Sequence, residues 1–184
     1  MISNVRQKTA IDLEKVKNSI RDVPDFPKPG ILFKDVSTSF KNADIFSFIL
    51  SEIHEHYKTS GITKVVGIES RGFILGGALA AELHAGFVPI RKPGKLPSKT
   101  FTQSYELEYG VDTIEIHSDA LHSDDVVLIH DDLLATGGTI NAAIDLVRKF
   151  GIKDIFVNFF VALDFLDGRK RIRSGIPTWS LVHF

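Results

Sequence analysis

The residues best suited to chemistry lie in one short stretch, 126–140, which reads VVLIHDDLLATGGTI. An apolar run there ends in two carboxylates, Asp131 and Asp132, and the segment Ala135–Thr139 then opens a predicted helix. Two adjacent glycines at a helix N-terminus let the backbone turn several N–H groups toward one point, where the helix dipole and the threonine hydroxyls favour a phosphate. The stretch therefore predicts a site for a phosphomonoester.

The same stretch excludes two common nucleotide sites. It lacks the lysine that the GxxxxGK[ST] loop of nucleoside triphosphatases requires, and no GxGxxG follows a predicted strand as in dinucleotide-binding folds. Carboxylates repel a nearby phosphate, so their partners in such a site are expected to be neutral hydroxyls or a cation. A ribose 5-phosphate supplies the hydroxyls. The alternative is a divalent metal held by His130, Asp131 and Asp132, although no second histidine has a fitting spacing.

Composition sets the class of protein. The chain has 184 residues, 43% hydrophobic and 24% charged, which is typical of one globular domain, residues 1–184. The absence of cysteine excludes disulfides and thiolate metal sites and fits a reducing compartment. A formal net charge of -1 creates no field for nucleic acid or acidic membranes. No stretch approaches the roughly 18 consecutive apolar residues of a membrane span. We expect a cytoplasmic protein without nucleic-acid or membrane partners.

The elements that must position this chemistry alternate between strand and helix. Thr9 and Asp12 are typical of a helix start, and that helix is expected to end at Val23–Pro24, before an irregular loop at 24–30. A second helix follows Asn42 and runs to about Tyr57. Apolar runs then predict strands at 64–68, 87–90, 126–129 and 155–163, helices at 73–83 and 139–150, and a loop at 131–138.

This alternation predicts an α/β fold, a mainly parallel sheet flanked by helices with right-handed crossovers. Ligands of such sheets bind at the carboxyl ends of the strands, here the loops after residues 68, 90, 129 and 161. Residues 91–104 are basic, rich in Pro and Gly and without periodicity, which suggests a functional loop. Segments 105–109 and 113–117 alternate around Gly110 and predict a β-hairpin. We call residues 91–117 the hood.

The segment from Asp131 to Thr139 resembles the 5-phosphoribosyl 1-pyrophosphate (PRPP) motif of the type I phosphoribosyltransferase family, in the form found in its adenine-specific members. Four further segments resemble that group in the same order and spacing. They are 25–35, 67–73, 91–97 and 105–110. The resemblance covers roughly residues 24–168 and implies the type I phosphoribosyltransferase fold, with a β-hairpin hood.

The resemblance implies a role for each matching residue toward PRPP. Asp131 and Asp132 would hold the ribose 2- and 3-hydroxyls. The backbone of a five-residue loop would bind the 5-phosphate: Ala135, Thr136, Gly137, Gly138 and Thr139. Ser70 and Arg71 match a pyrophosphate loop, with Arg71 supplying donors. The hood cations Arg91, Lys92 and Lys95 would also bind pyrophosphate, Arg91 across a dimer interface.

For the base, the resemblance implies that Phe33 and Leu163 sandwich a purine whose edge is read by the main chain of Leu32 and Lys34. A backbone carbonyl accepts from a 6-amino group but cannot pair with a 6-oxo group, so such a site would select adenine over hypoxanthine. Glu108, with Tyr109 beside it, matches a carboxylate proposed to handle a purine-ring proton.

The implied reaction transfers the 5-phosphoribosyl group of PRPP to N9 of adenine, giving AMP and pyrophosphate in purine salvage. Mg²⁺, held mainly by PRPP and by no direct protein ligand, would neutralise the leaving group, and the enzyme would be a homodimer.

The sequence departs from the family at His130, at Ala162 and at 98–100. Two alternatives stay open: a phosphoribosyltransferase for hypoxanthine or xanthine, and a regulatory protein that binds PRPP without turnover. The second is not favoured, because such regulators generally carry an added nucleic-acid-binding segment.

Overall fold

The structure is a computed structural model that describes residues 11–106 and 110–184. The chain divides into two compact units, Met1–Ile49 and Leu50–Phe184. The boundary falls inside helix α3 (Ala43–Tyr57), which begins and ends where the sequence predicted. Thr9, Glu108 and Tyr109 lie outside the described residues.

The first unit contains a short helix and a two-stranded antiparallel ladder. Helix α1 (Leu13–Ser19) begins at Asp12, whose carboxylate accepts from the Lys15 N–H at 2.9 Å. Strand β1 (Arg21–Pro24) pairs with β2 (Leu32–Asp35), and α2 (Ser37–Phe40) follows. The prediction of helix as far as Val23 was therefore wrong. Cross-strand pairs of opposite charge, such as Lys34 with Asp22 at 2.6 Å, favour the ladder over another helical turn.

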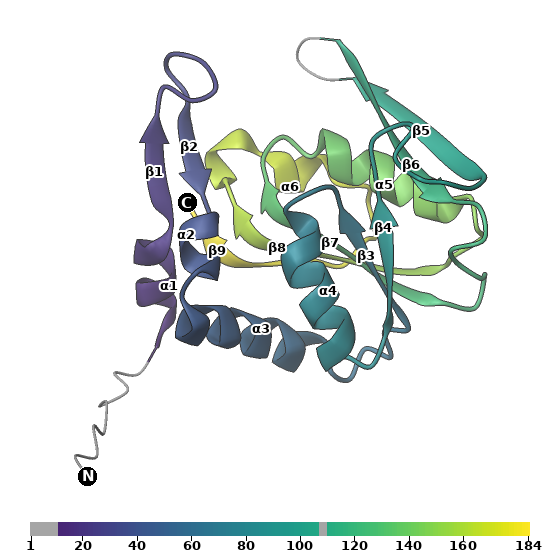
Figure 1. Ribbon diagram of the computed structural model, residues 1–184, viewed down its shortest axis with the longest axis horizontal. Helices are drawn as coiled ribbons and strands as arrows, with labels where there is room; N and C mark the ends of the chain where they lie inside the picture. Colours follow the sequence, from purple (N-terminus) through teal and green to yellow (C-terminus); the bar gives the residue numbers. More distant parts are fainter. Residues whose placement is uncertain (1–10, 107–109) are drawn as a thin grey trace. The chain divides into compact units, whose positions relative to one another are not determined.

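The second unit is built on a five-stranded sheet in the order β4-β3-β7-β8-β9 (Figure 1). Every neighbouring pair in it is parallel, which confirms the predicted parallel sheet. In chain order its strands are β3 (Lys64–Ile68), β4 (Gly86–Ile90), β7 (Val126–Leu134), β8 (Asp154–Ala162) and β9 (Thr178–His183). A 3₁₀ turn at Asp164–Leu166 and α6 (Gly168–Arg171) connect β8 to β9.

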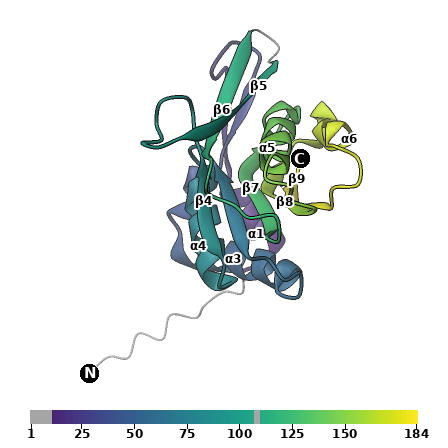
Figure 2. The same ribbon diagram turned by 90° about the vertical axis from the view of Figure 1, so that its right-hand side faces the viewer.

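Two helices cover opposite faces of this sheet (Figure 2). Helix α4 (Gly72–Glu82) joins β3 to β4, and α5 (Gly138–Arg148) joins β7 to β8. The two crossovers run in opposite directions along the sheet, so the same right-handed sense places their helices on opposite faces. On the α5 face the buried side chains Ile140, Ile144 and Val147 pack with Val127 and Ile129 of β7. Among the described residues, no helix is both long and apolar enough to span a bilayer.

Two predicted boundaries were wrong and one strand was missed, and pairing with a neighbouring strand explains each. Strand β7 continues through the predicted loop to Leu134, because β8 pairs with it as far as Ala162. Strand β5 (Thr100–Glu106) begins inside the predicted loop and pairs with β6 (Val111–His117). Strand β9 was not predicted at all. The hairpin β5–β6 projects from one end of the sheet (Figure 2).

Candidate active site

The predicted phosphate loop joins the end of β7 to the start of α5. Gly137 has φ +87°, and a Cβ added there would lie 2.9 Å from the Gly168 carbonyl oxygen. Both the left-handed backbone and the close packing therefore require glycine at this position. A cavity of about 80 Å³ opens over the loop. Its lining includes all five predicted loop residues and Asp131: Asp131, Leu133, Leu134, Ala135, Thr136, Gly137, Gly138, Thr139, Ile140 and Phe159.

The two acidic residues differ in their surroundings, because successive side chains of a strand point to opposite faces. Asp131 lines the cavity, and its Oδ1 accepts from the Asp132 N–H at 2.9 Å. The Asp132 side chain is only 5% exposed, and its Oδ2 lies 2.6 Å from Arg71 Nε. The structure thus brings Asp132 and Arg71 together, a contact that sequence spacing did not predict.

Burial controls the ionisation of this pair. It raises the pKa of Asp131 well above the ordinary value, and repulsion from the Asp132 carboxylate adds to the effect. Burial also raises the pKa of Asp132, although the Arg71 guanidinium opposes that shift. Asp132 is therefore the carboxylate with a fixed counter-charge. The Asp131 carboxyl is the better partner for neutral hydroxyls, which add no charge to the site.

His130 turns away from this cavity into the interior. It is fully buried, and its Nδ1 lies 2.7 Å from Asn158 Oδ1 on the neighbouring strand. Burial lowers the pKa of His130 to about 4, so the ring is neutral near pH 7. Within residues 11–106 and 110–184, no three His, Asp or Glu side chains gather as a metal site. The metal-ligand interpretation of His130, Asp131 and Asp132 is therefore not supported.

The predicted pyrophosphate loop lies between β3 and α4, next to the acidic pair. The Glu69–Ser70 peptide bond in this loop is cis. Helix α4 begins at Gly72, where an added Cβ would lie 3.0 Å from Asp131 Oδ1 and from the His130 carbonyl oxygen. The absence of a side chain at Gly72 is what lets this loop approach the end of β7 so closely.

The hood cations contact this loop through Glu69, a carboxylate to which the sequence assigned no role. Glu69 accepts from Arg91 Nε at 3.2 Å, from the Lys92 N–H at 2.9 Å and from Lys95 Nζ at 2.5 Å. Burial opposes ionisation of Glu69, yet these hydrogen bonds outweigh it and lower the pKa to about 2. The Lys92 side chain instead pairs with Asp112. The only sequence signal for Glu69 was its position beside Ser70.

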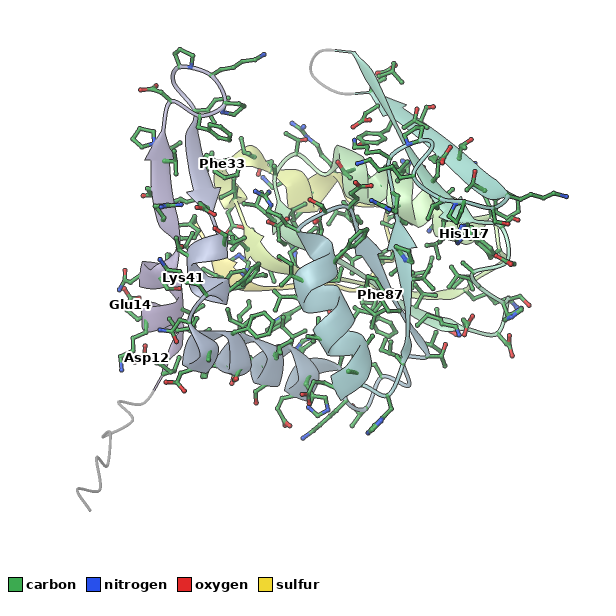
Figure 3. The ribbon with its side chains drawn as sticks, in the orientation of Figure 1. Asp12, Glu14, Phe33, Lys41, Phe87 and His117 are labelled. Carbon is green, nitrogen blue, oxygen red and sulfur yellow. The ribbon has the colours of Figure 1, made fainter. Side chains whose placement is uncertain are left out.

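The residues predicted to contact the base lie in separate units, and each is described in its own. In the first unit, Phe33, which Figure 3 labels beside β2, packs edge-on against Phe26 with ring centroids 5.1 Å apart. Leu32 is exposed, and Lys34 pairs with Asp22. In the second unit, the Leu163 N–H donates to the Leu134 carbonyl at 2.9 Å.

Leu163 also borders a cavity of about 420 Å³ with Asp164 and His183, among others. Ala162 beside it is buried within β8. Glu108, the predicted proton-transfer residue, and its neighbour Tyr109 lie outside the described residues.

Comparisons with known proteins show the family to which this fold belongs. The phosphoribosyl transferase domain family matches residues 38–178. An adenine phosphoribosyltransferase of Phocaeicola vulgatus is 57% identical over 169 residues, which are 92% of this chain and 97% of the relative. The crystal structure of the Rhodothermus marinus adenine phosphoribosyltransferase has a TM-score of 0.89 at 50% identity, covering 94% of this chain and 98% of that one.

The Giardia lamblia enzyme, solved in complex with 9-deazaadenine, has a TM-score of 0.91 at 41% identity and covers 95% of this chain and 99% of its own. These matches extend over both the loop with the acidic pair and the hood. The chain therefore belongs to the phosphoribosyltransferase family and, within it, to the adenine phosphoribosyltransferases, which convert adenine and PRPP to AMP.

Proposed function

We propose that the cavity over the Ala135–Thr139 loop holds the 5-phosphate of PRPP and that the adjoining carboxylates hold its ribose. The observation that carries this proposal is the junction of β7 and α5, where the residues at the helix start line a cavity that Asp131 also borders. The first N–H groups of a helix have no partner within the helix and can bind an anion. A phosphate bound there leaves the ribose hydroxyls as neutral partners for a carboxylate. Arg71, which faces Asp132, keeps a positive charge on the opposite side of the strand.

The leaving pyrophosphate is proposed to bind at the loop of Ser70 and Arg71, with Arg91, Lys92 and Lys95 of the hood. Support comes from the contacts that already bring Arg91 and Lys95 to Glu69 in this loop. Positive charge is needed there because C1–O bond cleavage at the ribose leaves an oxocarbenium-like carbon and an anionic leaving group. Mg²⁺ is proposed to be held mainly by PRPP, because Mg²⁺ in such sites is bound largely by substrate phosphates and water. When bound, Mg²⁺ would neutralise charge on the pyrophosphate.

The base is proposed to contact Phe33 and, through main-chain groups, Leu32 and Lys34. Leu163 is proposed as a second apolar contact to the purine. The ligand in the Giardia lamblia structure, 9-deazaadenine, supports an adenine-shaped site in this family. Glu108, beside Tyr109, is proposed to take the proton that adenine N9 must lose when N9 attacks C1.

We further propose that residues 1–184 act as one phosphoribosyltransferase domain, that the enzyme is a cytoplasmic homodimer, and that Arg91 acts across its interface. These three assignments rest on the family resemblance. Sedimentation of the purified protein with and without PRPP tests the dimer, and a monomer in both conditions would refute it.

The direct test of the function is an assay of AMP formation from adenine, PRPP and Mg²⁺. We expect AMP and pyrophosphate in equal amounts. PRPP binding without product would favour the regulatory alternative, and product from hypoxanthine but not adenine would favour a different base. An Arg71→Gln variant, which keeps a polar side chain but loses the charge beside Asp132, should lose most of the rate.

A further inference from the structure

A second carboxylate, Asp112, lies in the hood and fixes one of its cations. Asp112 is on β6, and its Oδ2 pairs with Lys92 Nζ. Its Oδ1 accepts from the Thr113 N–H at 2.8 Å, so the orientation of the carboxylate is set by the backbone. The side chains of Lys92 and Asp112 are 40% and 27% exposed, respectively. An ion pair so open to water adds little to stability, and its main effect is to restrict where the lysine ammonium lies.

The same carboxylate connects to the phosphate loop through a tyrosine. Tyr105 lies opposite Asp112 in the β5–β6 ladder, and its hydroxyl donates to Asp112 Oδ2 at 3.1 Å. Thr139 Oγ1 in turn donates to the Tyr105 hydroxyl at 3.3 Å. The ring itself lies over the loop, since a Cβ added to Gly138 would be 3.7 Å from Tyr105 Cδ2. Burial raises the pKa of Tyr105, so the phenol stays a neutral donor near pH 7.

These contacts form a continuous chain from Thr139 through Tyr105 and Asp112 to Lys92. We propose that Tyr105 and Asp112 are positioning residues, which fix the Lys92 ammonium relative to the phosphate loop. One PRPP molecule can then contact the loop with its 5-phosphate and Lys92 with its pyrophosphate at the same time. This inference rests on the proposed function, which assigns the 5-phosphate to the loop and the pyrophosphate to Lys92. An ammonium has three donors, so the contact with Asp112 is compatible with a second contact to pyrophosphate.

The chain supplies conservative variants for the test. Tyr105→Phe removes the hydroxyl and keeps the ring over Gly138, and Asp112→Asn removes the charge with little change in shape. Ser104→Ala is the matched control, because Ser104 makes a 2.9 Å hydrogen bond to Thr113 on the same hairpin but does not belong to the chain of contacts. Urea unfolding of each variant identifies any that fold poorly.

Steady-state kinetics and calorimetry with magnesium pyrophosphate give the readout. We expect Tyr105→Phe and Asp112→Asn each to raise the KM for PRPP and the Kd of magnesium pyrophosphate by about 2- to 12-fold, the effect of one net hydrogen bond. The KM for adenine should not change, and Ser104→Ala should behave as the wild type. An unchanged or lower KM for PRPP in both variants would overturn the inference.

A double-mutant cycle separates this inference from the function on which it rests. If Asp112 acts through Lys92, Asp112→Asn should have no further effect in a Lys92→Ala background. A persistent effect there would refute the positioning role. If Lys92→Ala raises the KM for PRPP while Asp112→Asn and Tyr105→Phe do not, the inference alone fails. If Lys92→Ala leaves both PRPP and pyrophosphate binding unchanged, the assignment of Lys92 fails and the inference fails with it.

Discussion

At the scale of single residues, Asp131 and Asp132 have the same chemistry but different surroundings. Asp131 borders the cavity over the phosphate loop, whereas Asp132 is buried against Arg71. We expect Asp131→Asn and Asp132→Asn each to lower kcat/KM for PRPP by roughly 10- to 150-fold, because a hydrogen bond to a charged group contributes about 1.5–3 kcal/mol.

Steady-state kinetics at varied PRPP measures this loss, and circular dichroism checks that both variants fold. Asp132→Asn should in addition weaken pyrophosphate binding, since Arg71 loses the carboxylate contact that orients its guanidinium. Wild-type kcat/KM for PRPP in both variants would contradict the ribose-binding role.

His130 makes the stability of the fold depend on pH. The unfolded chain protonates a histidine near its ordinary pKa of about 6.5, whereas burial lowers the pKa of His130 in the fold to about 4. Between these values the unfolded state binds more protons, so stability falls as the pH falls. We expect a loss of roughly 2 kcal/mol in the free energy of unfolding between pH 7 and pH 5 from this residue.

Urea unfolding of wild type and His130→Val at both pH values measures the difference. The variant should be less stable at pH 7, because Asn158 Oδ1 loses its hydrogen bond with His130, yet its stability should change less with pH. His122→Asn, at an exposed position, is the control and should keep the wild-type dependence. Equal pH dependence in wild type and His130→Val would show that His130 does not cause it.

At the scale of elements, the hood segment from Lys92 to Lys99 connects β4 to β5 and includes three lysines. Its contact with the body of the unit includes Glu69, which accepts from Lys95 and from the Lys92 backbone. We expect trypsin to cleave this segment in the empty enzyme and to cleave it more slowly when PRPP occupies the site, because a ligand contacted by the hood closes it.

Limited proteolysis with mass analysis of the fragments follows both states. Glu69→Gln should speed cleavage of the empty enzyme, since it removes the charge that Arg91 and Lys95 contact. Cleavage at Lys58, which is also exposed but outside the hood, serves as the internal reference. The same rate of hood cleavage with and without PRPP would rule out closure.

Elements with a continuous apolar pattern were predictable from sequence, and elements that depend on a neighbour were not. The run at Lys64–Ile68 is buried almost throughout, so its composition alone indicated β3. Strand β9 is only partly buried and forms because β8 pairs with it from Val157 to Ala162. The carboxylates at the end of β7 are unusual in a strand, and the pairing with β8, which continues from Asp131 to Leu134, keeps them in one.

The residues of the candidate site likewise include some that the sequence predicted and some that it did not. The phosphate loop could be found because its conformation requires glycine, and glycine is visible in the sequence. Glu69 and Asp112 could not be found, because each contacts a cation distant in the chain: Glu69 contacts Lys95 at a separation of 26 residues, and Asp112 contacts Lys92 at a separation of 20. No local spacing encodes contacts that the packing of the hood creates.

At the scale of the whole molecule, ligand binding should stabilise the fold. A ligand at 100 times its Kd adds about 2.7 kcal/mol to the free energy of unfolding. For a chain of this length we expect PRPP with Mg²⁺ to raise the Tm by roughly 5–11 °C. Thermal unfolding followed by circular dichroism measures the shift, with ribose, which lacks the phosphate, as the control ligand. No shift at millimolar PRPP would contradict the phosphate-loop assignment.

The base that the enzyme accepts follows from main-chain chemistry. If the Leu32 carbonyl accepts from the 6-amino group of adenine, hypoxanthine places its 6-oxo group against that carbonyl, and two acceptors then face each other. A buried polar group left unpaired costs about 1–3 kcal/mol, and the repulsion adds to this cost. We therefore expect kcat/KM for adenine to exceed that for hypoxanthine or guanine by roughly 100-fold or more.

Competition between the bases at fixed PRPP measures this ratio in one reaction. Phe33→Ala should raise the KM for adenine and leave the KM for PRPP nearly unchanged, because stacking on an aromatic ring stabilises the base alone. Phe26→Ala is the matched control, since Phe26 packs edge-on against Phe33 in the same unit and has no assigned contact with the base. Adenine and hypoxanthine share the N9 atom that attacks the ribose but differ in hydrogen bonding at the 6-position. Comparable kcat/KM for the two bases would therefore show that the Leu32 carbonyl does not select the group at the 6-position.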